Sequence, residues 1–309
     1  MKSKIDFYCI GAQKAATSWL YERLNELPDF SMPYIKELHF FDRSEKYPSP
    51  SKLSRSLISR LLDYDTLSTS VMEVSSSLYR MNFKKMRWML NWHFSKIHDD
   101  WYLSLFENLN RISGDMTPAY SILDVVDIKK MYELSPDAKI ILILRNPIER
   151  AISHLKFYHQ SRGILINKLS INKIKCFLDS DNQVLRSDYL RTLNNYSEVY
   201  KSSNILVGFY DAIIDHPNIF LAEVVDFLGG KKNQIQPLKL NRKINVSKKE
   251  VINQEILNYI TEKYANNINK LSKIFGGYCS LWKNRLDNNK HYQKKTYLTI
   301  TLDKIDLTK

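Results

Sequence analysis

Residues 138–147, AKIILILRNP, place the tightest limit on how this chain can fold. The run from Ile140 to Leu144 is wholly apolar, with no alternation between polar and apolar side chains. Such a strand buries both of its faces, which is typical of a central strand in a parallel sheet covered by helices. Arg145 follows at the end of the strand, so we expect it at the carboxyl edge of the sheet, where open α/β folds bind ligands.

Strand and helix patterns alternate along most of the chain. Strands are expected at 7–10, 138–145 and 205–210. Helices are expected at 17–26, one or two within 83–110, then 125–133, from Pro147 onward, 189–200, 218–228 and near 250–274. This order predicts one α/β domain with a central parallel sheet flanked by helices. We expect the domain to span residues 1–282, with a basic tail over 283–309 that packs on it or extends from it.

Composition excludes several classes of protein. Hydrophobic residues make up 44% of the chain, enough for a substantial core and against intrinsic disorder. No run approaches the roughly 18 consecutive apolar residues of a membrane span. The three cysteines are too few and too scattered for a disulfide framework or a zinc site, and Cys9 is expected to be buried. With no room for a signal peptide before Gly11, these features indicate a cytoplasmic protein.

The charge balance favours anionic partners. Lys and Arg number 46 against 33 Asp and Glu, which gives a formal net charge of +13. Phosphates, nucleotides, acidic glycans, acidic lipid surfaces and nucleic acids all suit such a field. No dedicated nucleic-acid-binding module is recognisable, so a nucleic acid is not expected as partner. A peripheral contact with a membrane surface is compatible with this charge.

Residues 11–18, GAQKAATS, connect the first expected strand to the first expected helix. Gly11 allows a sharp turn, and the free N–H groups at the start of such a helix bind anions. Lys14 adds a positive charge, while Thr17 and Ser18 supply hydroxyl donors. The stretch therefore predicts a phosphate-binding loop, the alternative being a plain strand–turn–helix corner. It lacks the second glycine and the lysine–hydroxyl pair of G-x-x-x-x-G-K-[ST], which argues against a P-loop kinase.

A second anion-binding element is predicted in ILILRNPIERAISHLKFY. Arg145 offers a planar fork for a phosphate, and Ser153 lies about two turns into the following helix. A single arginine at a strand end also occurs as a surface ion pair. Two such elements at the ends of parallel strands, however, indicate one ligand with two separated phosphate-like groups.

The two motifs together resemble those of sulfotransferases that use 3′-phosphoadenosine 5′-phosphosulfate (PAPS). GAQKAATSWLYERL resembles the family's 5′-phosphosulfate loop, and LRNPIERAISHLKFY resembles its 3′-phosphate motif, R-[ND]-P-x-x-R-A-x-S. KELHFFD, GDMTPAY and residues 204–229 continue the resemblance in the family's order over most of residues 5–230. The sequence patterns KExHFFD and GDxTPxY resemble those of the glycan-modifying and bacterial branch of the family more than those of its cytosolic steroid and phenol branch. The resemblance implies a P-loop NTPase-like sulfotransferase fold.

The resemblance also implies roles for single residues. Lys14 would contact the bridging and sulfuryl oxygens of PAPS. The residues implied for donor binding are Gly11, Ala15, Ala16, Thr17 and Ser18 around the 5′-phosphate, Arg145 and Ser153 at the 3′-phosphate, and Tyr210 near the adenine. The family's glycine-rich C-terminal loop has no match, because residues 239–249 are basic but lack glycine. Arg242, Lys243 and Lys248 are the candidates there.

The implied reaction transfers a sulfuryl group from PAPS to an acceptor hydroxyl and leaves 3′,5′-ADP (PAP). The branch implies a carbohydrate acceptor, with a polyketide or other small-molecule alcohol as the alternative. By analogy with phosphoryl transfer, positioning and charge stabilisation dominate the catalysis, and no metal is expected. A base must also take the proton of the acceptor.

Glu37 in KELHFFD is the implied base. His39 competes with it, because residues two apart on an extended segment share one face. His93, Asp115 and His154 are weaker candidates for the same role. Lys36 is expected to bridge donor and acceptor. The remaining expectations concern acceptor binding: Asp115, Thr117 and Tyr120 shape the acceptor side or form a structural turn, and the aromatic cluster at 88–102 stacks on a sugar or packs in the core.

Overall fold

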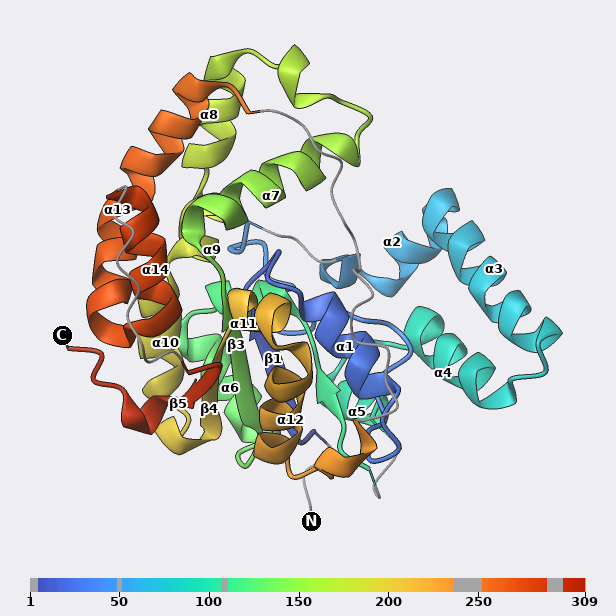
Figure 1. Ribbon diagram of the computed structural model, residues 1–309. Coiled ribbons are helices and arrows are strands. Elements are labelled where there is room, and N and C mark those ends of the chain that lie inside the picture. The colour runs from blue at the N-terminus through green and yellow to red at the C-terminus, as the bar shows by residue number, and fades with distance from the viewer. Residues whose placement is uncertain (1–4, 49–51, 107–110, 236–251, 288–296, 309) are drawn as a thin grey trace.

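The apolar run forms β3 (Lys139–Leu144), the middle strand of a five-stranded sheet in the order β2-β1-β3-β4-β5 (Figure 1). The computed structural model describes residues 5–48, 52–106, 111–235, 252–287 and 297–308. The other strands are β1 (Phe7–Gly11), β2 (Gly114–Asp115), β4 (Ile205–Phe209) and β5 (Thr299–Thr301). Strand β3 pairs in parallel with β1 and β4, so the predicted central parallel strand is confirmed.

The sheet is mostly parallel rather than wholly parallel. Strand β5 runs antiparallel to β4, with Leu206 opposite Thr301, and it comes from the segment predicted as a tail. It was missed because a three-residue edge strand carries almost no periodic signal. Helix α14 (Gly277–Leu286) runs across residue 282, and the proposed division of the chain there stays a prediction.

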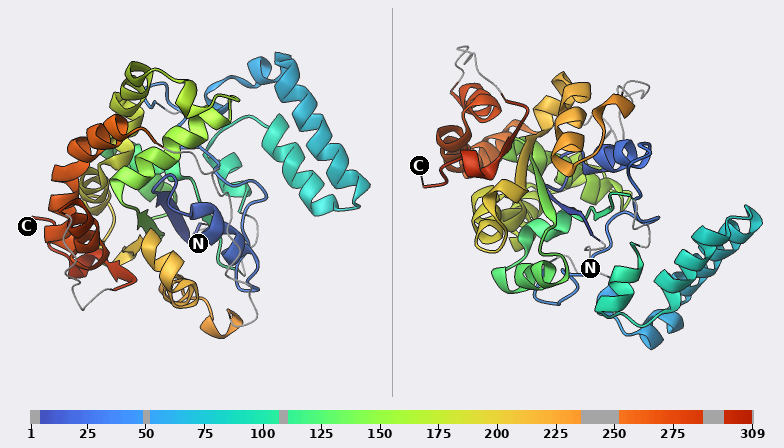
Figure 2. Two further views of the ribbon diagram at one scale, coloured as in Figure 1. Left: turned by 45° about the horizontal axis from the view of Figure 1, so that its top comes forward. Right: turned by 90° about the horizontal axis from the view of Figure 1, so that it is seen from below.

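Helices cover both faces of the sheet. In Figures 1 and 2, α1 and α12 lie on one face, while α6 and α10 lie on the other. Within the described ranges no helix is both long and apolar enough to cross a membrane. The bounds of the helices before β4 are α1 (Thr17–Asn25), α2 (Leu57–Leu62), α3 (Tyr64–Tyr79), α4 (Phe83–Phe94), α5 (Asp99–Ser104), α6 (Val125–Leu134), α7 (Pro147–Gln160), α8 (Ile171–Asp179), α9 (Asp181–Ser187) and α10 (Tyr189–Ser197). After β4 come α11 (Tyr210–Asp215), α12 (Pro217–Leu228), α13 (Gln254–Phe275) and α14.

Most of the predicted helices are present, and several short ones were not predicted. Helices α1, α4, α5, α6, α7, α10, α12 and α13 follow the sequence pattern. Helices α2, α3, α8, α9, α11 and α14 were missed. The Ser/Pro-rich stretch after Tyr47 leads into α2 and α3, and these two helices carry many serines and exposed apolar side chains rather than an inward apolar stripe.

The connection from β3 to α7 positions Arg145. Asn146 caps α7 by accepting a hydrogen bond from the Ile148 N–H at 3.0 Å, and Pro147 occupies the first turn. Proline suits that position because its missing N–H is not needed there. The Tyr189 hydroxyl donates to the Arg145 carbonyl at 2.8 Å. The backbone of Arg145 is therefore held between a buried strand and a capped helix.

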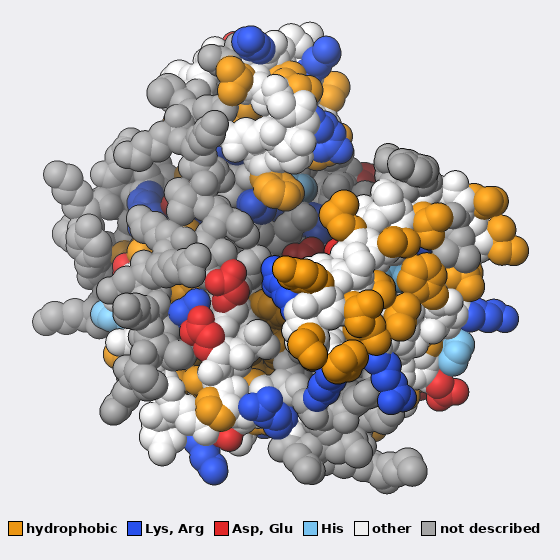
Figure 3. Space-filling view, turned by 90° about the vertical axis from the view of Figure 1, so that its right-hand side faces the viewer, with side chains coloured by type: hydrophobic (Ala, Val, Ile, Leu, Met, Phe, Trp, Pro, Cys, Tyr) orange, Lys and Arg blue, Asp and Glu red, His pale blue; other side chains and the backbone are white. Residues whose placement is uncertain are grey.

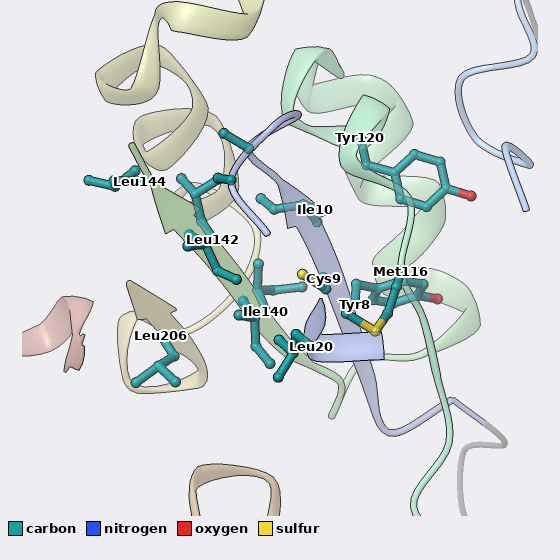
Figure 4. Close-up of a cluster of buried hydrophobic side chains, with 14 of the residues drawn as sticks. Tyr8, Cys9, Ile10, Leu20, Met116, Tyr120, Ile140, Leu142, Leu144 and Leu206 are labelled. Carbon is teal, nitrogen blue, oxygen red and sulfur yellow. The ribbon is translucent and has the colours of Figure 1, made fainter. Parts of the chain in front are cut away.

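The core is continuous from the sheet into the helices. Figure 4 shows Cys9, Ile10, Ile140 and Leu142 from neighbouring strands packed with Leu20 of α1. All five side chains are fully buried, as predicted for Cys9. Burying a large aliphatic side chain contributes about 1.5–3 kcal/mol. This packing fixes β1 against β3, the two strands that carry the predicted anion-binding motifs.

We expect Gly114→Ala to destabilise the fold strongly. A Cβ at residue 114 would lie 2.5 Å from both the ring and the carbonyl oxygen of Phe7, so β1 and β2 would have to separate. The cost should be about 3 kcal/mol, measured by urea unfolding at an unchanged slope. Gly163→Ala is the control, because its φ of +70° strains alanine but its Cβ meets open space. That variant should lose about 1 kcal/mol, and equal losses would contradict the packing argument.

Candidate active site

The loop between β1 and α1 has the backbone of an anion site. Gly11 takes a φ of 150°, which glycine adopts readily, and Lys14 and Ala16 are left-handed with φ near 69° and 64°. Successive turns of this kind gather N–H groups into a concavity that binds anions. Among the described residues, no side chain caps the N-terminus of α1 at Ala16. The N–H groups of Thr17 and Ser18 therefore belong to an uncapped first turn, where the helix dipole is positive.

Arg145 lies directly against this loop. One guanidinium nitrogen, Nη1, donates a hydrogen bond to the Lys14 carbonyl at 2.8 Å. The guanidinium carbon lies 4.2 Å from the ring centre of Tyr210, the first residue of α11. Nε of Arg145 is also 3.6 Å from the carboxylate of Glu149. The predicted 5′-phosphate loop, the predicted 3′-phosphate arginine and the predicted adenine-side tyrosine thus meet at one edge of the sheet.

One face of α7 closes over the same loop. The Lys14 ammonium lies 4.0 Å from the ring centre of Phe157, an exposed residue of this helix. Ser153 lies one turn before Phe157, and residues four apart share a helix face. The half-buried Ser153 is therefore on the side of α7 that faces the loop. Sequence reasoning missed Phe157, because an apolar residue on an amphipathic helix gives no signal that it touches a cation.

Residues 36–42 bring both predicted bases into one charged cluster. Lys36 forms an ion pair with Oε1 of Glu37, while Nε2 of His39 lies 3.6 Å from Oε2 of the same carboxylate. Nδ1 of His39 is hydrogen-bonded to Oδ2 of Asp42 at 2.7 Å, and Asp42 is fully buried. Glu37 and His39 both have positive φ, 67° and 54°, rather than the extended backbone expected from sequence. They nevertheless lie side by side.

The ion pairs set the protonation of this cluster. Burial alone would raise the pKa of Glu37, but interactions with His39 and Lys36 outweigh it and lower the pKa to about 2. Burial alone would lower the pKa of His39, but Asp42 and Glu37 raise it to about 9. At neutral pH Glu37 is therefore ionised and His39 is protonated. Of these two residues, only Glu37 is able to accept a proton in this state.

Asp115, Thr117 and Tyr120 form a buried network beneath the cluster. Asp115 accepts hydrogen bonds from Thr117 at 2.7 Å and from Tyr120 and Tyr102 at 2.8 Å. Burial raises the pKa of Asp115 despite these donors. The Phe40 N–H in turn donates to the Tyr120 hydroxyl at 2.9 Å. These residues hold the 36–42 segment in place, and direct contact with an acceptor stays a prediction.

Two of the weaker candidates for the base, His93 and His154, have partners elsewhere. His93 is hydrogen-bonded to Ser70 at 2.9 Å and Glu73 at 2.8 Å, and it joins α4 to α3. His154 is hydrogen-bonded to Gln183 at 2.6 Å, and burial, with positive charge nearby, lowers its pKa to about 3. Neither histidine is placed with the 36–42 segment by any contact of the described residues. The candidates for the C-terminal loop, Arg242, Lys243 and Lys248, lie outside the described residues.

A buried arginine of the second motif was missed as a site-supporting residue. Arg150 is fully buried, and it donates to Ser187 at 2.7 and 3.2 Å and to the Gln183 side chain at 2.7 Å. These bonds tie α7 to α9, and α7 carries Ser153 and Phe157. A buried cation needs partners because its desolvation is costly. The arginine within R-N-P-x-x-R-A was the available signal.

Comparison with known protein families identifies the family of this chain. Residues 4–299 match the family model described as "Sulfotransferase domain". The chain belongs to the sulfotransferase family. This match confirms the family resemblance and, with the sheet described above, the α/β sulfotransferase fold. A comparison with curated proteins finds no match.

Three solved sulfotransferase structures are similar to this chain to different degrees. A sulfotransferase from Alicyclobacillus acidocaldarius is 18% identical with a TM-score of 0.57, and the alignment covers 93% of this chain and 97% of that one. The sulfotransferase domain of the Synechococcus PCC 7002 olefin synthase is 15% identical with a TM-score of 0.49, over 95% and 97% of the two chains. A mouse sulfotransferase complexed with PAP is 13% identical with a TM-score of 0.41, over 87% and 66%. The similarity to the Alicyclobacillus acidocaldarius structure shows that this chain has the same fold.

We expect His39 to make stability depend on alkaline pH. Its pKa is raised from 6.5 to about 9, so its contribution is complete below pH 6.5 and is lost as pH rises through about 9. The melting temperature of wild type should therefore exceed that of His39→Gln most below pH 6.5. The difference should shrink between about pH 7 and pH 10.

Thermal unfolding across this pH range checks the expectation. His216→Gln is the control, because His216 is exposed. Its difference from wild type should be small and independent of pH. A constant difference for His39→Gln would show that the ion pair with Asp42 does not control the protonation of His39.

Proposed function

We propose that this sulfotransferase transfers a sulfuryl group from PAPS to an acceptor hydroxyl, most suitably on a carbohydrate, and releases PAP. The observation that carries the proposal is the hydrogen bond from Arg145 to the Lys14 carbonyl. It joins two anion-binding motifs closely enough for one doubly phosphorylated nucleotide to contact both. The Tyr210 ring beside Arg145 offers a surface for the adenine.

The side chains present suit an anionic donor. Burial lowers the pKa of Lys14, and the nearby positive charges of Arg145 and Lys36 lower it further, while Glu37 opposes them. Three cations crowded in one site repel one another, and a phosphosulfate would relieve that repulsion. The uncapped N-terminus of α1 adds backbone donors to the same place. The described residues contain no group of three or more His, Cys, Asp or Glu side chains placed to hold a metal ion.

The proposed chemistry is in-line displacement at sulfur. The acceptor oxygen forms a bond to sulfur while the bond from sulfur to the bridging oxygen breaks, and that oxygen leaves with the 5′-phosphate. Lys14 stabilises the negative charge that grows on the leaving oxygen. Glu37 accepts the proton of the acceptor hydroxyl.

Lys36 gives Glu37 a way to become a stronger base. With His39 and Lys36 both paired to it, the Glu37 carboxylate has a pKa of about 2, too low for efficient proton abstraction. Sulfuryl oxygens near Lys36 would compete for its ammonium and release the carboxylate. The pKa of Glu37 would then rise as the donor binds. The protonated state of His39 supports Glu37 rather than His39 as the base.

A groove lined by residues 30–34, which precede the 36–42 segment in the chain, supports an extended acceptor. A cavity of about 960 Å³ lies between α4 and residues 30–34. Its lining includes Tyr34, Trp88, Arg87 and Asn91, a mixture of aromatic and polar side chains that suits a sugar. Tyr34 is three residues from Glu37. A small-molecule or polyketide alcohol, the second candidate acceptor, would not need this groove.

The acceptor is tested by transfer of label from PAPS to glycans of increasing length and to small alcohols. A carbohydrate acceptor predicts that kcat/KM rises with chain length and that Arg87→Ala lowers it for long acceptors only. Equal turnover of small alcohols by wild type and Arg87→Ala would favour the second candidate acceptor.

We also propose that the protein acts in the cytoplasm, in keeping with the free cysteines Cys9, Cys176 and Cys279.

We expect Lys14→Ala and Arg145→Ala to remove stabilisation by PAP. Each variant deletes a charge-assisted contact at one end of the nucleotide. Wild type at a PAP concentration of about 100 times its Kd should gain about 2.7 kcal/mol. Both variants should gain almost none at the same concentration in a thermal-shift measurement.

Lys129→Ala is the matched control for loss of one positive charge, since Lys129 is exposed on α6. It should keep the full PAP-induced shift. Circular dichroism without PAP separates loss of binding from loss of fold. Undiminished PAP shifts in both Lys14→Ala and Arg145→Ala would remove the donor assignment.

We expect Glu37→Gln to bind PAP as wild type does but to lose turnover by about 10²–10⁴-fold. Glutamine keeps the size of the side chain but cannot take a proton at neutral pH. The measurement is single-turnover transfer from labelled PAPS, with PAP affinity measured in parallel. Normal turnover in Glu37→Gln would assign the base elsewhere.

A further inference from the structure

Helices α2, α3 and α4 form an arm, residues 57–94, that projects from the side of the domain (Figures 1 and 2). Many of its apolar side chains are exposed. The exposed large hydrophobic residues of the arm are Ile58, Leu62, Val71, Met72, Leu78, Tyr79, Met81, Phe83 and Leu90. Figure 3 looks at this side of the molecule and shows hydrophobic side chains gathered over it. A contiguous exposed apolar surface of this kind marks an interaction site.

Helix α3 turns two serines inward beside Val74, which packs against the core, and turns an apolar face outward. Ser70 and Ser77 are buried, and Ser70 and Glu73 are hydrogen-bonded to His93 of α4. Four apolar residues, at positions 71, 72, 78 and 79, recur at i, i+1, i+7 and i+8, which places them on one helix face. That face is exposed. An ordinary surface helix has the opposite arrangement.

The tip of the arm carries the most exposed apolar side chain of this surface, Tyr79, and a hydrogen-bonded turn holds it. Tyr79 is 89% exposed and Met81 is 75% exposed. The turn between α3 and α4 is closed by a hydrogen bond from the Met81 N–H to the Leu78 carbonyl at 2.8 Å. Asn82 then caps α4 by accepting from the Lys85 N–H at 2.9 Å. The apolar side chains are therefore presented by a defined turn.

The charge around the tip is uniformly positive. Residues 74–98 contain no Asp or Glu, and their basic residues are Arg80, Lys84, Lys85, Arg87 and Lys96. A second copy of the chain docking through this same surface would bring like charges together, which opposes association. A convex tip also needs a deep complementary groove in a protein partner. A lipid bilayer accepts a protruding apolar tip without one.

We propose that the arm docks this protein on an anionic lipid surface, with the tip at residues 78–83 inserted between headgroups and Arg80 and Lys85 against acidic lipids. Apolar side chains that enter the interface beside basic side chains are the general pattern of peripheral binding. The inference does not rest on the sulfuryl-transfer reaction, although Phe83 and Leu90 of the arm also line the groove proposed for the acceptor. It names a second binding surface away from the β1–α1 loop.

Vesicle sedimentation of the full-length chain tests the proposal. The probes are vesicles of equal parts phosphatidylcholine and phosphatidylglycerol, and vesicles of phosphatidylcholine alone. Wild type should bind the mixed vesicles and bind the neutral ones far more weakly. The tip variant Leu78→Ser/Tyr79→Ser/Met81→Asn should bind the mixed vesicles at least about tenfold more weakly. Asparagine suits position 81 because Met81 has a φ of 52°.

The matched control replaces three exposed apolar residues elsewhere, in Val126→Ser/Ile214→Ser/Ile219→Ser. It should bind vesicles as wild type does. Both triple variants should keep the PAP-induced thermal shift, which reports that the fold and the donor site are intact. Equal vesicle binding by the tip variant, or no binding by wild type, would overturn the proposal. So would a dimer in solution that the tip variant alone abolishes, because the surface would then serve a second copy.

Discussion

The hydrogen bond from Arg145 to the Lys14 carbonyl is the contact on which the site depends. It is possible because β1 and β3 are direct neighbours in the sheet, so that the loop after one strand touches the residue after the other. The packing of both strands is apolar and complete, which keeps these ends from moving apart. Two motifs far apart in the sequence are thereby brought into direct contact.

Charge balance explains why this surface needs a ligand. The positive charges of Arg145 and Lys36 lower the pKa of the partly buried Lys14, and the carboxylate of Glu37 opposes them. Glu37 is itself shared between Lys36 and His39, and His39 is held by a buried carboxylate. The proposed donor would compete with Glu37 for the ammonium of Lys36. The cluster is therefore suited to couple donor binding to the basicity of Glu37, which is what a sulfuryl transfer requires of it.

The arm and the site differ in which side chains they bury and which they expose. At the site, partly buried charged side chains are paired with one another. On the arm, polar side chains of α3 are buried against α4 while apolar ones face solvent. Neither arrangement stabilises the fold as well as an ordinary surface would. Burying polar or charged side chains costs free energy, and so does exposing apolar side chains to water.

The sequence by itself determined the fold class, the central strand and the two motifs, because continuous apolar runs and helix-start residues act locally. It predicted Gly11–Ser18, Arg145 and the Glu37/His39 pair as parts of one site. Only the tertiary structure decided that Arg145 bonds to the loop itself, that Phe157 contacts Lys14, and that β5 completes the sheet as an antiparallel edge. It also decided that His39 is protonated, since the partner responsible, Asp42, is buried by packing rather than by any local pattern. Contacts between distant segments depend on how the core closes, and no periodicity in the chain encodes them.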